Sequence, residues 1–222
     1  IITNIGEAHI ENFKNLNGIA KAKAEIIENI SKDGYLILNG DDKYFNYFLK
    51  LARKRKIIVL SCGNSIKSNA KLVKNTLHKN YNNLHLKILN KNIYLKVKNV
   101  NSLTISNILF TLLVLHVLDL DLKKIIKSSN NFQLVEGRGK AHFISRYKKK
   151  FQLIDESYNA NPSSVKNAIN NFSNIKRNQG KKYFLLGDML ELGKKSDNYH
   201  KNLAHFINHS DIDKLFVYGK NA

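Results

Sequence analysis

The chain has 222 residues, which is long enough to bury a sizeable core as one large domain or two modest ones. Its formal net charge is +20, but the lysines are scattered among asparagines and isoleucines rather than gathered in one stripe, which argues against a nucleic-acid-binding protein. A single cysteine, Cys62, excludes an intrachain disulfide and fits a reducing compartment, so we expect a cytoplasmic protein.

The first part of the chain alternates between expected strands and helices. Strands are expected at residues 1–5, at 35–38, which lead into Asn39-Gly-Asp-Asp42, and at 57–61. Helices are expected at residues 17–30 and 43–54. This alternation is typical of a parallel sheet with crossover helices, so it predicts an α/β fold.

The hydrophobic period then changes. Between residues 70 and 100 it is close to two, which predicts a β-hairpin over residues 84–97 that turns at Asn90-Lys-Asn92. Helices are expected at residues 106–118 and 122–131. The apolar run at 108–118 is shorter than the roughly 20 residues that a membrane span needs, so it predicts a buried helix.

Two strands of the second part each end in an acidic loop. Residues 151–154 are typical of a buried strand, and the loop Asp155-Glu-Ser-Tyr-Asn-Ala-Asn-Pro162 follows them. Pro162 is expected to begin a helix whose inward positions are Val165, Ala168, Ile169, Phe172 and Ile175. One unit later, a strand from Tyr183 leads into Gly187-Asp-Met-Leu-Glu-Leu-Gly193, and a last strand is expected at residues 215–219. Open α/β sheets bind ligands at the carboxyl ends of strands, although turn and cap residues alone would also explain such loops.

Together, these two loops resemble the C-terminal domain of the Mur ligase family. The similarity extends through Gly137-Arg138, which matches the family's interdomain hinge, to Asn4-Ile-Gly-Glu-Ala-His9 and the helix that contains Lys21-Ala-Lys-Ala-Glu-Ile26. It covers nearly the whole chain. The resemblance implies that residues 1–136 are the later part of a central ATP-binding domain, with a parallel sheet and a small antiparallel section, and that residues 137–222 begin a Rossmann-like C-terminal domain.

The resemblance also implies an activity: an ATP-dependent amide-bond ligase of peptidoglycan precursor synthesis. ATP would phosphorylate the carboxylate of a UDP-N-acetylmuramoyl-tripeptide, and the amine of D-alanyl-D-alanine would attack the acyl phosphate. The implied cofactors are ATP and Mg²⁺, and we expect a monomer with no nucleic-acid partner and no membrane span. Because no G-x-x-x-x-G-K-[ST] pattern occurs here, we expect the family's phosphate loop to lie upstream of Ile1 and the 222-residue chain alone to be inactive.

Several residues match nucleotide-binding positions of the family. The resemblance places Asn107 on the adenine side, Arg138 near the ATP phosphates and Asp155 at the ribose. Asn159 and Asn161 either orient phosphate or peptide groups or are turn and cap residues. Arg138 has a plainer alternative as a solvated linker residue.

The sequence departs from the family pattern at two places. Leu103-Thr104 stand where a His-Asn pair is usual, which puts the adenine contacts in doubt. Glu156 stands where the family commonly has Asp. In the second acidic loop, Asp188 and Glu191 are either groups on the amine-substrate side or residues of a capped loop, and His200 and His205 are expected to be structural.

We expect two residues, His9 and Lys23, to help bind a magnesium ion and to take part in catalysis. On an α-helix, Ile19 and Ile27 lie one turn either side of Lys23, which predicts that its side chain points into the apolar face. A buried ammonium tends to lose its charge, and the matching family lysine becomes a carbamate that offers oxygen ligands to magnesium, with His9 helping to hold the ion. The alternative is that Lys23 extends to the surface beside Glu25 or Glu28.

Two other classes of protein stay open. A truncated gene could leave these motifs in a noncatalytic remnant of a ligase. A basic nucleic-acid-binding protein is less favoured, and it would require the lysines to share one face.

Overall fold

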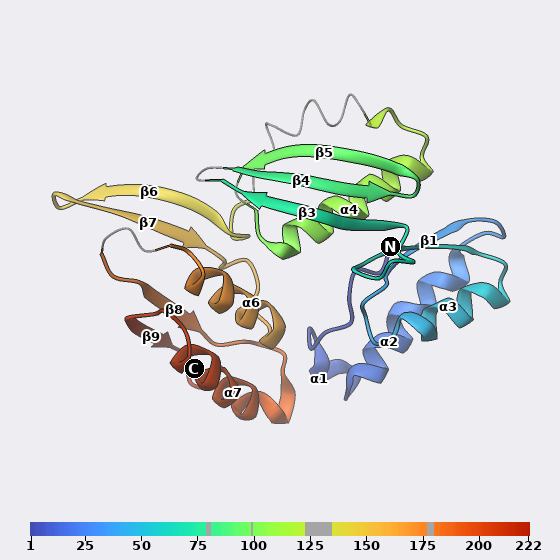
Figure 1. Cartoon of the computed structure of the whole chain (residues 1–222). Helices are drawn as coiled ribbons and strands as arrows, with labels where there is room; N and C mark the ends of the chain where they lie inside the picture. Colours follow the sequence, from blue (N-terminus) through green and yellow to red (C-terminus); the bar gives the residue numbers. More distant parts are fainter. Residues whose placement is uncertain (79–80, 99, 123–134, 177–179) are drawn as a thin grey trace. The chain divides into compact units, whose positions relative to one another are not determined.

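A computed structural model of the chain describes residues 1–78, 81–98, 100–122, 135–176 and 180–222 (Figure 1). The chain divides into two compact units: unit 1 contains residues 1–5 and 19–133, and unit 2 contains residues 6–18 and 134–222. The backbone therefore passes from unit 1 to unit 2 and back again before residue 20. Each unit is described by itself below.

Unit 1 is built on a five-stranded sheet in the order β1-β2-β3-β4-β5. The strands are β1 (Tyr35–Asn39), β2 (Ile58–Cys62), β3 (Ala70–Leu77), β4 (Tyr81–Ile88) and β5 (Lys91–Lys98). Helix α3 (Phe45–Lys54) connects β1 to β2, which are parallel, as the alternating pattern predicted. The mixed α/β architecture is thereby confirmed for this unit, with an antiparallel section formed by β3, β4 and β5.

The hairpin of β4 and β5 is present, but its turn lies earlier than predicted. Ile88 pairs with Lys91, so the loop consists of Leu89 and Asn90. Leu89 has a φ of 52°, which is the left-handed backbone that tight hairpin turns require. The sequence pointed to Asn90-Lys-Asn92 because asparagine favours such turns, whereas strand pairing extends to Lys91 and leaves only the preceding two residues for the loop.

Helix α4 (Ser102–Val117) lies across one face of this sheet and forms the main core with it (Figure 1). It begins four residues earlier than predicted, because the Asn101 side chain accepts a hydrogen bond from the Thr104 amide at 2.8 Å and caps the first turn. Buried residues of the core include Ile37 of β1, Leu84 and Leu86 of β4, and Leu113 of α4. The next predicted helix, residues 122–131, lies almost wholly outside the described residues.

Strand β1 is covered on both faces. Leu36, Ile37 and Leu38 are all at most 3% exposed, and side chains of a strand alternate between faces. Because Ile37 joins the core under α4, its two neighbours point to the opposite face. Residue Ile2 lies beside β1, but only as an isolated parallel bridge to Leu38, so the strand predicted at residues 1–5 is reduced to this contact.

The helix predicted at residues 17–30 is interrupted. The α-helical part is α2 (Leu16–Ala24), and a 3₁₀ helix, η1 (Glu25–Asn29), continues from it. A short helix, α1 (Ile10–Phe13), precedes α2 and belongs to unit 2. The change of helix type alters which side chains share a face, with consequences for Lys23 described below.

Unit 2 contains two separate two-stranded sheets. Strands β6 (Lys140–Arg146) and β7 (Lys149–Asp155) are antiparallel, and β8 (Tyr183–Gly187) and β9 (Lys214–Tyr218) are parallel. The prediction that residues 151–154 are a buried strand was wrong about burial: the strand forms, but Phe151 is 51% and Leu153 47% exposed. Apolar composition indicates a strand but does not show whether another element packs on it.

Helices α6 (Pro162–Ser173) and α7 (Ser196–Asn208) pack together in unit 2, and a short 3₁₀ turn, η3 (Gly193–Lys195), precedes α7. Their core contains Val165 and Ile169 of α6, Leu186 of β8 and Leu203 of α7. Of the predicted inward positions of α6, Ile175 is instead 40% exposed, because the helix ends before it. Within the described part of the chain, no helix is long and apolar enough to cross a membrane.

Candidate active site

Asp155 lies at the end of β7, where the sequence placed it, and its carboxylate is tied to the backbone on both sides. One oxygen accepts from the Ser157 amide at 3.0 Å, and the other accepts from the Gly137 amide at 3.2 Å. The hydrogen bonds from Ser157 lower the pKa of Asp155, with a smaller contribution from Gly137. Each carboxylate oxygen has two acceptor positions, so an ionised Asp155 can still accept from a ligand hydroxyl.

The backbone at residue 137 requires a glycine. Gly137 has a φ of +72°, its carbonyl accepts from the Tyr158 amide at 3.2 Å, and an added Cβ would lie 2.8 Å from the Tyr158 Cβ. The loop after β7 is therefore held directly against Gly137. A side chain at residue 137 would force the two apart.

Arg138 is exposed, and its guanidinium stacks on the ring of Tyr158 with the Cζ atom 4.5 Å from the ring centroid. It also faces Glu156, whose pKa is raised by burial and by the charge of Asp155 and is partly lowered again by Arg138. The structure thus places the turn that carries Arg138 beside Asp155 and the loop that follows it. Arg138 is an oriented cation at a strand end, a suitable group for binding phosphate.

The two asparagines of this loop differ in role. Asn161 caps α6: its side chain accepts from the Ser164 amide at 2.9 Å, and the Ser164 hydroxyl accepts from the Asn161 amide at 3.0 Å. This capping box, with Pro162 at the first helical position, gives Asn161 the structural role that the sequence left open. Asn159 is exposed in the loop.

The second acidic loop, residues 187–193, is held by long-range bonds. The Asp188 carboxylate accepts from the backbone amides of Lys220, Asn221 and Ala222 at 2.9, 3.0 and 2.7 Å. Next to it, the Met189 amide donates to Nε2 of His200 at 3.0 Å. Met189 and Leu192 are buried at 1% and 4% exposure, which leaves Leu190 and Glu191 at the surface between them.

His9 belongs to unit 2 and lies against this loop. Its Nδ1 atom contacts the Glu191 carboxylate, and both side chains are about half exposed. The Glu11 amide donates to the Glu191 carbonyl at 3.1 Å. Within unit 2, the structure therefore pairs His9, which was expected to take part in catalysis, with Glu191, whose role the sequence left open.

Lys23 does not point into the apolar face, so that prediction was wrong. It is exposed, and its ammonium donates to the carbonyl of Asn4 at 3.1 Å. The helix becomes 3₁₀ at Glu25, and three residues make one 3₁₀ turn, so Ile27 lies over Ala24 rather than over Lys23. Lys23 therefore extends to the surface, as the alternative interpretation expected, but its partner is a backbone carbonyl and not Glu25 or Glu28.

Asn107 lies on the exposed side of α4, where its carbonyl accepts from the Thr111 hydroxyl at 2.9 Å. Of the two residues that depart from the family pattern, Leu103 is 43% exposed and Thr104 is buried at the capped end of the helix. Neither residue offers an exposed amide or imidazole to an adenine base. Asn107 remains a surface amide that a ligand can reach.

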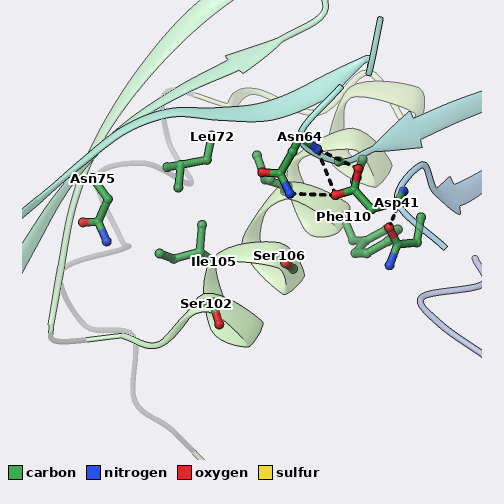
Figure 2. Close-up of a pocket in the computed structure, with 12 residues that line it drawn as sticks. Asp41, Asn64, Leu72, Asn75, Ser102, Ile105, Ser106 and Phe110 are labelled. Carbon is green, nitrogen blue, oxygen red and sulfur yellow. Dashed lines mark hydrogen bonds between the residues drawn. The ribbon is translucent and has the colours of Figure 1, made fainter. Parts of the chain in front are cut away.

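A hollow of about 270 Å³ opens in unit 1 between the carboxyl ends of β1 and β2, strand β3 and the first turns of α4 (Figure 2). Its floor includes Leu72, Ile105 and Phe110. Asp41 lines this hollow, and its carboxylate accepts from Asn64, from the backbone amide at 2.9 and 3.0 Å and from the side-chain nitrogen at 2.8 Å. Figure 2 shows the Asp41 and Asn64 contact beside the hollow. Asn107 is not among the residues that line it.

Among the described residues, no group of three or more His, Cys, Asp and Glu side chains is placed to hold a metal ion. The Lys23 ammonium donates a hydrogen bond, whereas a metal ligand must offer a lone pair to the ion.

Sequence reasoning missed one buried charge, Lys182, at the start of β8. Its side chain is 8% exposed, and the ammonium donates to the carbonyls of Ser173 and Ile175 at 2.9 and 2.7 Å and to Asp211 at 2.9 Å. A cation at the carboxyl end of α6 is favourable there. In the sequence, Lys182 is one of two adjacent lysines, and nothing local distinguishes it from Lys181.

Family profiles match most of the chain. The Mur ligase middle domain matches residues 1–115, and the Mur ligase glutamate ligase domain matches residues 141–222.

Individual relatives agree with these matches. The chain is 32% identical over 222 residues to the UDP-N-acetylmuramoyl-tripeptide--D-alanyl-D-alanine ligase of Buchnera aphidicola, covering 99% of this chain and 46% of that protein. It is 32% identical to the ligase of the same name from Rickettsia prowazekii, covering 99% and 48%. In structure it resembles MurF ligase from Thermotoga maritima in complex with ADP, with a TM-score of 0.80, 23% identity and coverage of 98% of this chain and 48% of that one. The chain spans about half the length of these relatives.

Proposed function

This chain belongs to the Mur ligase family, and we propose that the complete protein is an ATP-dependent ligase that adds D-alanyl-D-alanine to UDP-N-acetylmuramoyl-tripeptide. One observation carries the proposal: nearly the whole chain aligns at 32% identity with two ligases that bear this name. The proposed role is in peptidoglycan precursor synthesis, and hence in cell-wall formation and cell division. Because both nucleotide substrates are cytoplasmic compounds, we place the reaction in the cytoplasm.

The proposed reaction has two steps. The tripeptide carboxylate attacks the γ-phosphorus of ATP, ADP leaves, and an acyl phosphate forms. The amine of D-alanyl-D-alanine then attacks the acyl carbon, loses a proton and expels phosphate, so an amide bond replaces the acyl phosphate. Negative charge is concentrated on the transferred phosphoryl group, where a fixed cation contributes most.

The residues of unit 2 support parts of this reaction. We propose that Arg138, oriented by Tyr158, binds the nucleotide phosphates, and that Asp155 accepts from a ribose hydroxyl with the acceptor positions left by its backbone partners. Asn159 is proposed as a further polar contact from the same exposed loop. Asn161 supports this group by capping α6. In unit 1, Asn107 is proposed to meet the adenine.

The proposed cofactor Mg²⁺ would neutralise charge on the ATP phosphates when bound. His9 and Lys23 are the proposed contributors from this chain, and carboxylates from elsewhere in the complete protein would have to complete the set. The carbamate role of Lys23 now depends on the resemblance alone, because its side chain is exposed.

Lys23→Ala should abolish most activity, with partial rescue by short-chain carboxylic acids. If Lys23→Ala keeps near-normal activity at low bicarbonate, or if Lys21→Ala lowers activity more than Lys23→Ala does, the carbamate is excluded.

The assay for the proposed function uses the complete protein with ATP, magnesium, UDP-N-acetylmuramoyl-tripeptide and D-alanyl-D-alanine. We expect ADP release that depends on both substrates, and a product whose mass equals the two substrates less one water. Preferential use of a single amino acid such as D-glutamate would point to another Mur ligase activity. ATP binding with no turnover would favour the noncatalytic remnant.

The 222-residue chain itself provides a second test. It lacks a glycine-rich phosphate-binding pattern, so we expect no ADP release from it under the same conditions. Measurable turnover by the chain alone would contradict the assignment of its two parts to incomplete domains.

A further inference from the structure

Glu191 holds the segment that carries His9 at two points. Its side chain contacts Nδ1 of His9, and its backbone carbonyl accepts from the Glu11 amide at 3.1 Å. Between these residues, Ile10 packs against the core of unit 2. The contact joins residues 182 positions apart in the sequence, so it is a tertiary contact and not a local turn.

The loop that carries Glu191 is held in place by hydrogen bonds of Asp188 and Met189. Asp188 is bound by three backbone amides, and His200, which is 7% exposed, accepts from the Met189 amide. Nδ1 of His200 lies 2.9 Å from the Ser196 carbonyl, to which it donates, so both ring nitrogens are used within α7 and the loop. Glu191 therefore extends from a braced loop and not from a freely moving one.

The backbone of both partners is in an uncommon conformation. His9 has a φ of 58° and Glu191 a φ of 60°, in the left-handed region that non-glycine residues seldom adopt. Such conformations persist where the surroundings determine them, and they gather at functional sites. Here both strained residues belong to the same contact.

The chemistry of the contact selects one nitrogen of His9. An ionised carboxylate can only accept hydrogen bonds, so Nδ1 must carry the hydrogen, and Nε2 is the ring nitrogen left for another group. Carboxylates that bind one imidazole nitrogen fix both the tautomer and the orientation of the ring. We propose that Glu191 is a positioning residue for His9: it binds Nδ1, fixes the orientation of the ring and leaves Nε2 for another group. This inference rests on the proposed participation of His9 in the ligase reaction.

The direct test is an NMR measurement on the complete protein labelled with ¹⁵N-histidine, with the His9 signals assigned from a His9→Gln variant. Two-bond ¹H–¹⁵N correlations distinguish the two tautomers. We expect wild-type His9 to carry its hydrogen on Nδ1, and Glu191→Ala to convert it to the Nε2-protonated form that free imidazole side chains prefer. Glu191→Gln should retain the wild-type tautomer in large part, because its amide oxygen still accepts. If Glu191→Ala leaves the tautomer unchanged, the positioning role is overturned.

Ligase kinetics on the same proteins complete the test. Glu191→Ala should lower kcat about tenfold, as expected when a group that orients a functional histidine is lost, with little change in KM, and Glu191→Gln should recover most of the loss. The matched control is Glu11→Ala, which removes a carboxylate from the same segment but keeps the backbone bond to Glu191. An equal loss in Glu11→Ala would overturn the proposal. Full activity of His9→Gln, together with a changed tautomer in Glu191→Ala, would instead remove the premise that His9 takes part in the reaction.

Discussion

Units 1 and 2 differ in the extent of their sheets and of their cores. In unit 1 the strands join one five-stranded sheet, and β1, β4 and β5 place buried residues against α4. In unit 2 the strands form two separate pairs, much of β6 and β7 is exposed, and the core is smaller. There, Asp155, Asp188 and Lys182 hold loops through bonds to the backbone. We infer that apolar burial dominates the stability of unit 1, whereas in unit 2, with its smaller core, these polar groups contribute a larger share of the stability.

The largest expected effect tests the core of unit 1. Leu113 is fully buried on α4, so Leu113→Ala should lower the free energy of unfolding of this unit by about 2–5 kcal/mol. Urea unfolding, monitored by hydrogen exchange in peptides of β4 and β5, measures this free energy of unfolding. Leu118→Ala at the end of the same helix is the control, since Leu118 is 60% exposed and should cost little. Equal effects would contradict the assigned core.

The corresponding test in unit 2 removes a charge. Lys182→Met keeps the apolar stem but leaves two helix-end carbonyls and Asp211 without the ammonium, so we expect a loss of about 1–3 kcal/mol, confined to unit 2. Hydrogen exchange in α6 and β9 would show it. Lys181→Met, at the exposed neighbouring residue, should be close to neutral. Destabilisation of unit 1 by Lys182→Met would break the distinction between the units.

A functional test concerns the acid of the first loop. In the complete enzyme, Asp155→Ala should raise the apparent KM for ATP roughly tenfold, the loss expected for one hydrogen bond to a charged group. The KM for D-alanyl-D-alanine should change little. Steady-state kinetics with each substrate varied in turn measure both values. The opposite pattern would move Asp155 to the amine site.

Asp188 gives a pH-dependent prediction. Burial raises its pKa, but the backbone amides of residues 220–222 outweigh this and hold the pKa below the ordinary value. A carboxyl with a lowered folded pKa stabilises the fold above its unfolded pKa of about 3.9, and this stabilisation is lost as the pH falls through the folded pKa. The amide shifts of residues 220–222 should therefore titrate only below the ordinary Asp range, and Asp188→Asn should abolish the titration. A midpoint at or above that range would exclude the bonding described.

The smallest effect serves as a probe of unit 1. Burial raises the pKa of Cys62 to about 12, and the thiol is 3% exposed, so alkylation by iodoacetamide at pH 8 should be slow and limited by opening of the unit. Mass spectrometry of the single modified cysteine measures the rate. Leu113→Ala should accelerate it, and Lys182→Met should not. Fast modification of the wild-type chain would show that the core around Cys62 is open.

The local signals of the sequence were sufficient for most elements. The hydrophobic pattern located β1, β2 and α3, and Pro162 at a first helical position located the start of α6. The strand-end loops that carry Asp155 and Asp188 were found because a short apolar run and the polar residues after it lie next to each other in sequence. The family, too, was identified from such contiguous motifs, and the profile matches confirm it.

Only the tertiary structure decided which side chains meet. The carboxylate partners of His9 and Lys182 lie 182 and 29 residues away, and the backbone partners of Asp188 lie at least 32 residues away, so no local pattern could supply them. Ile27 was wrongly placed one turn from Lys23, because the switch from α to 3₁₀ geometry at Glu25 puts Ile27 over Ala24 instead. The exposure of β7 depends on what packs beside it. Hydrophobic period and capping are properties of neighbouring residues, whereas burial and long-range pairing depend on how separate elements close over one another.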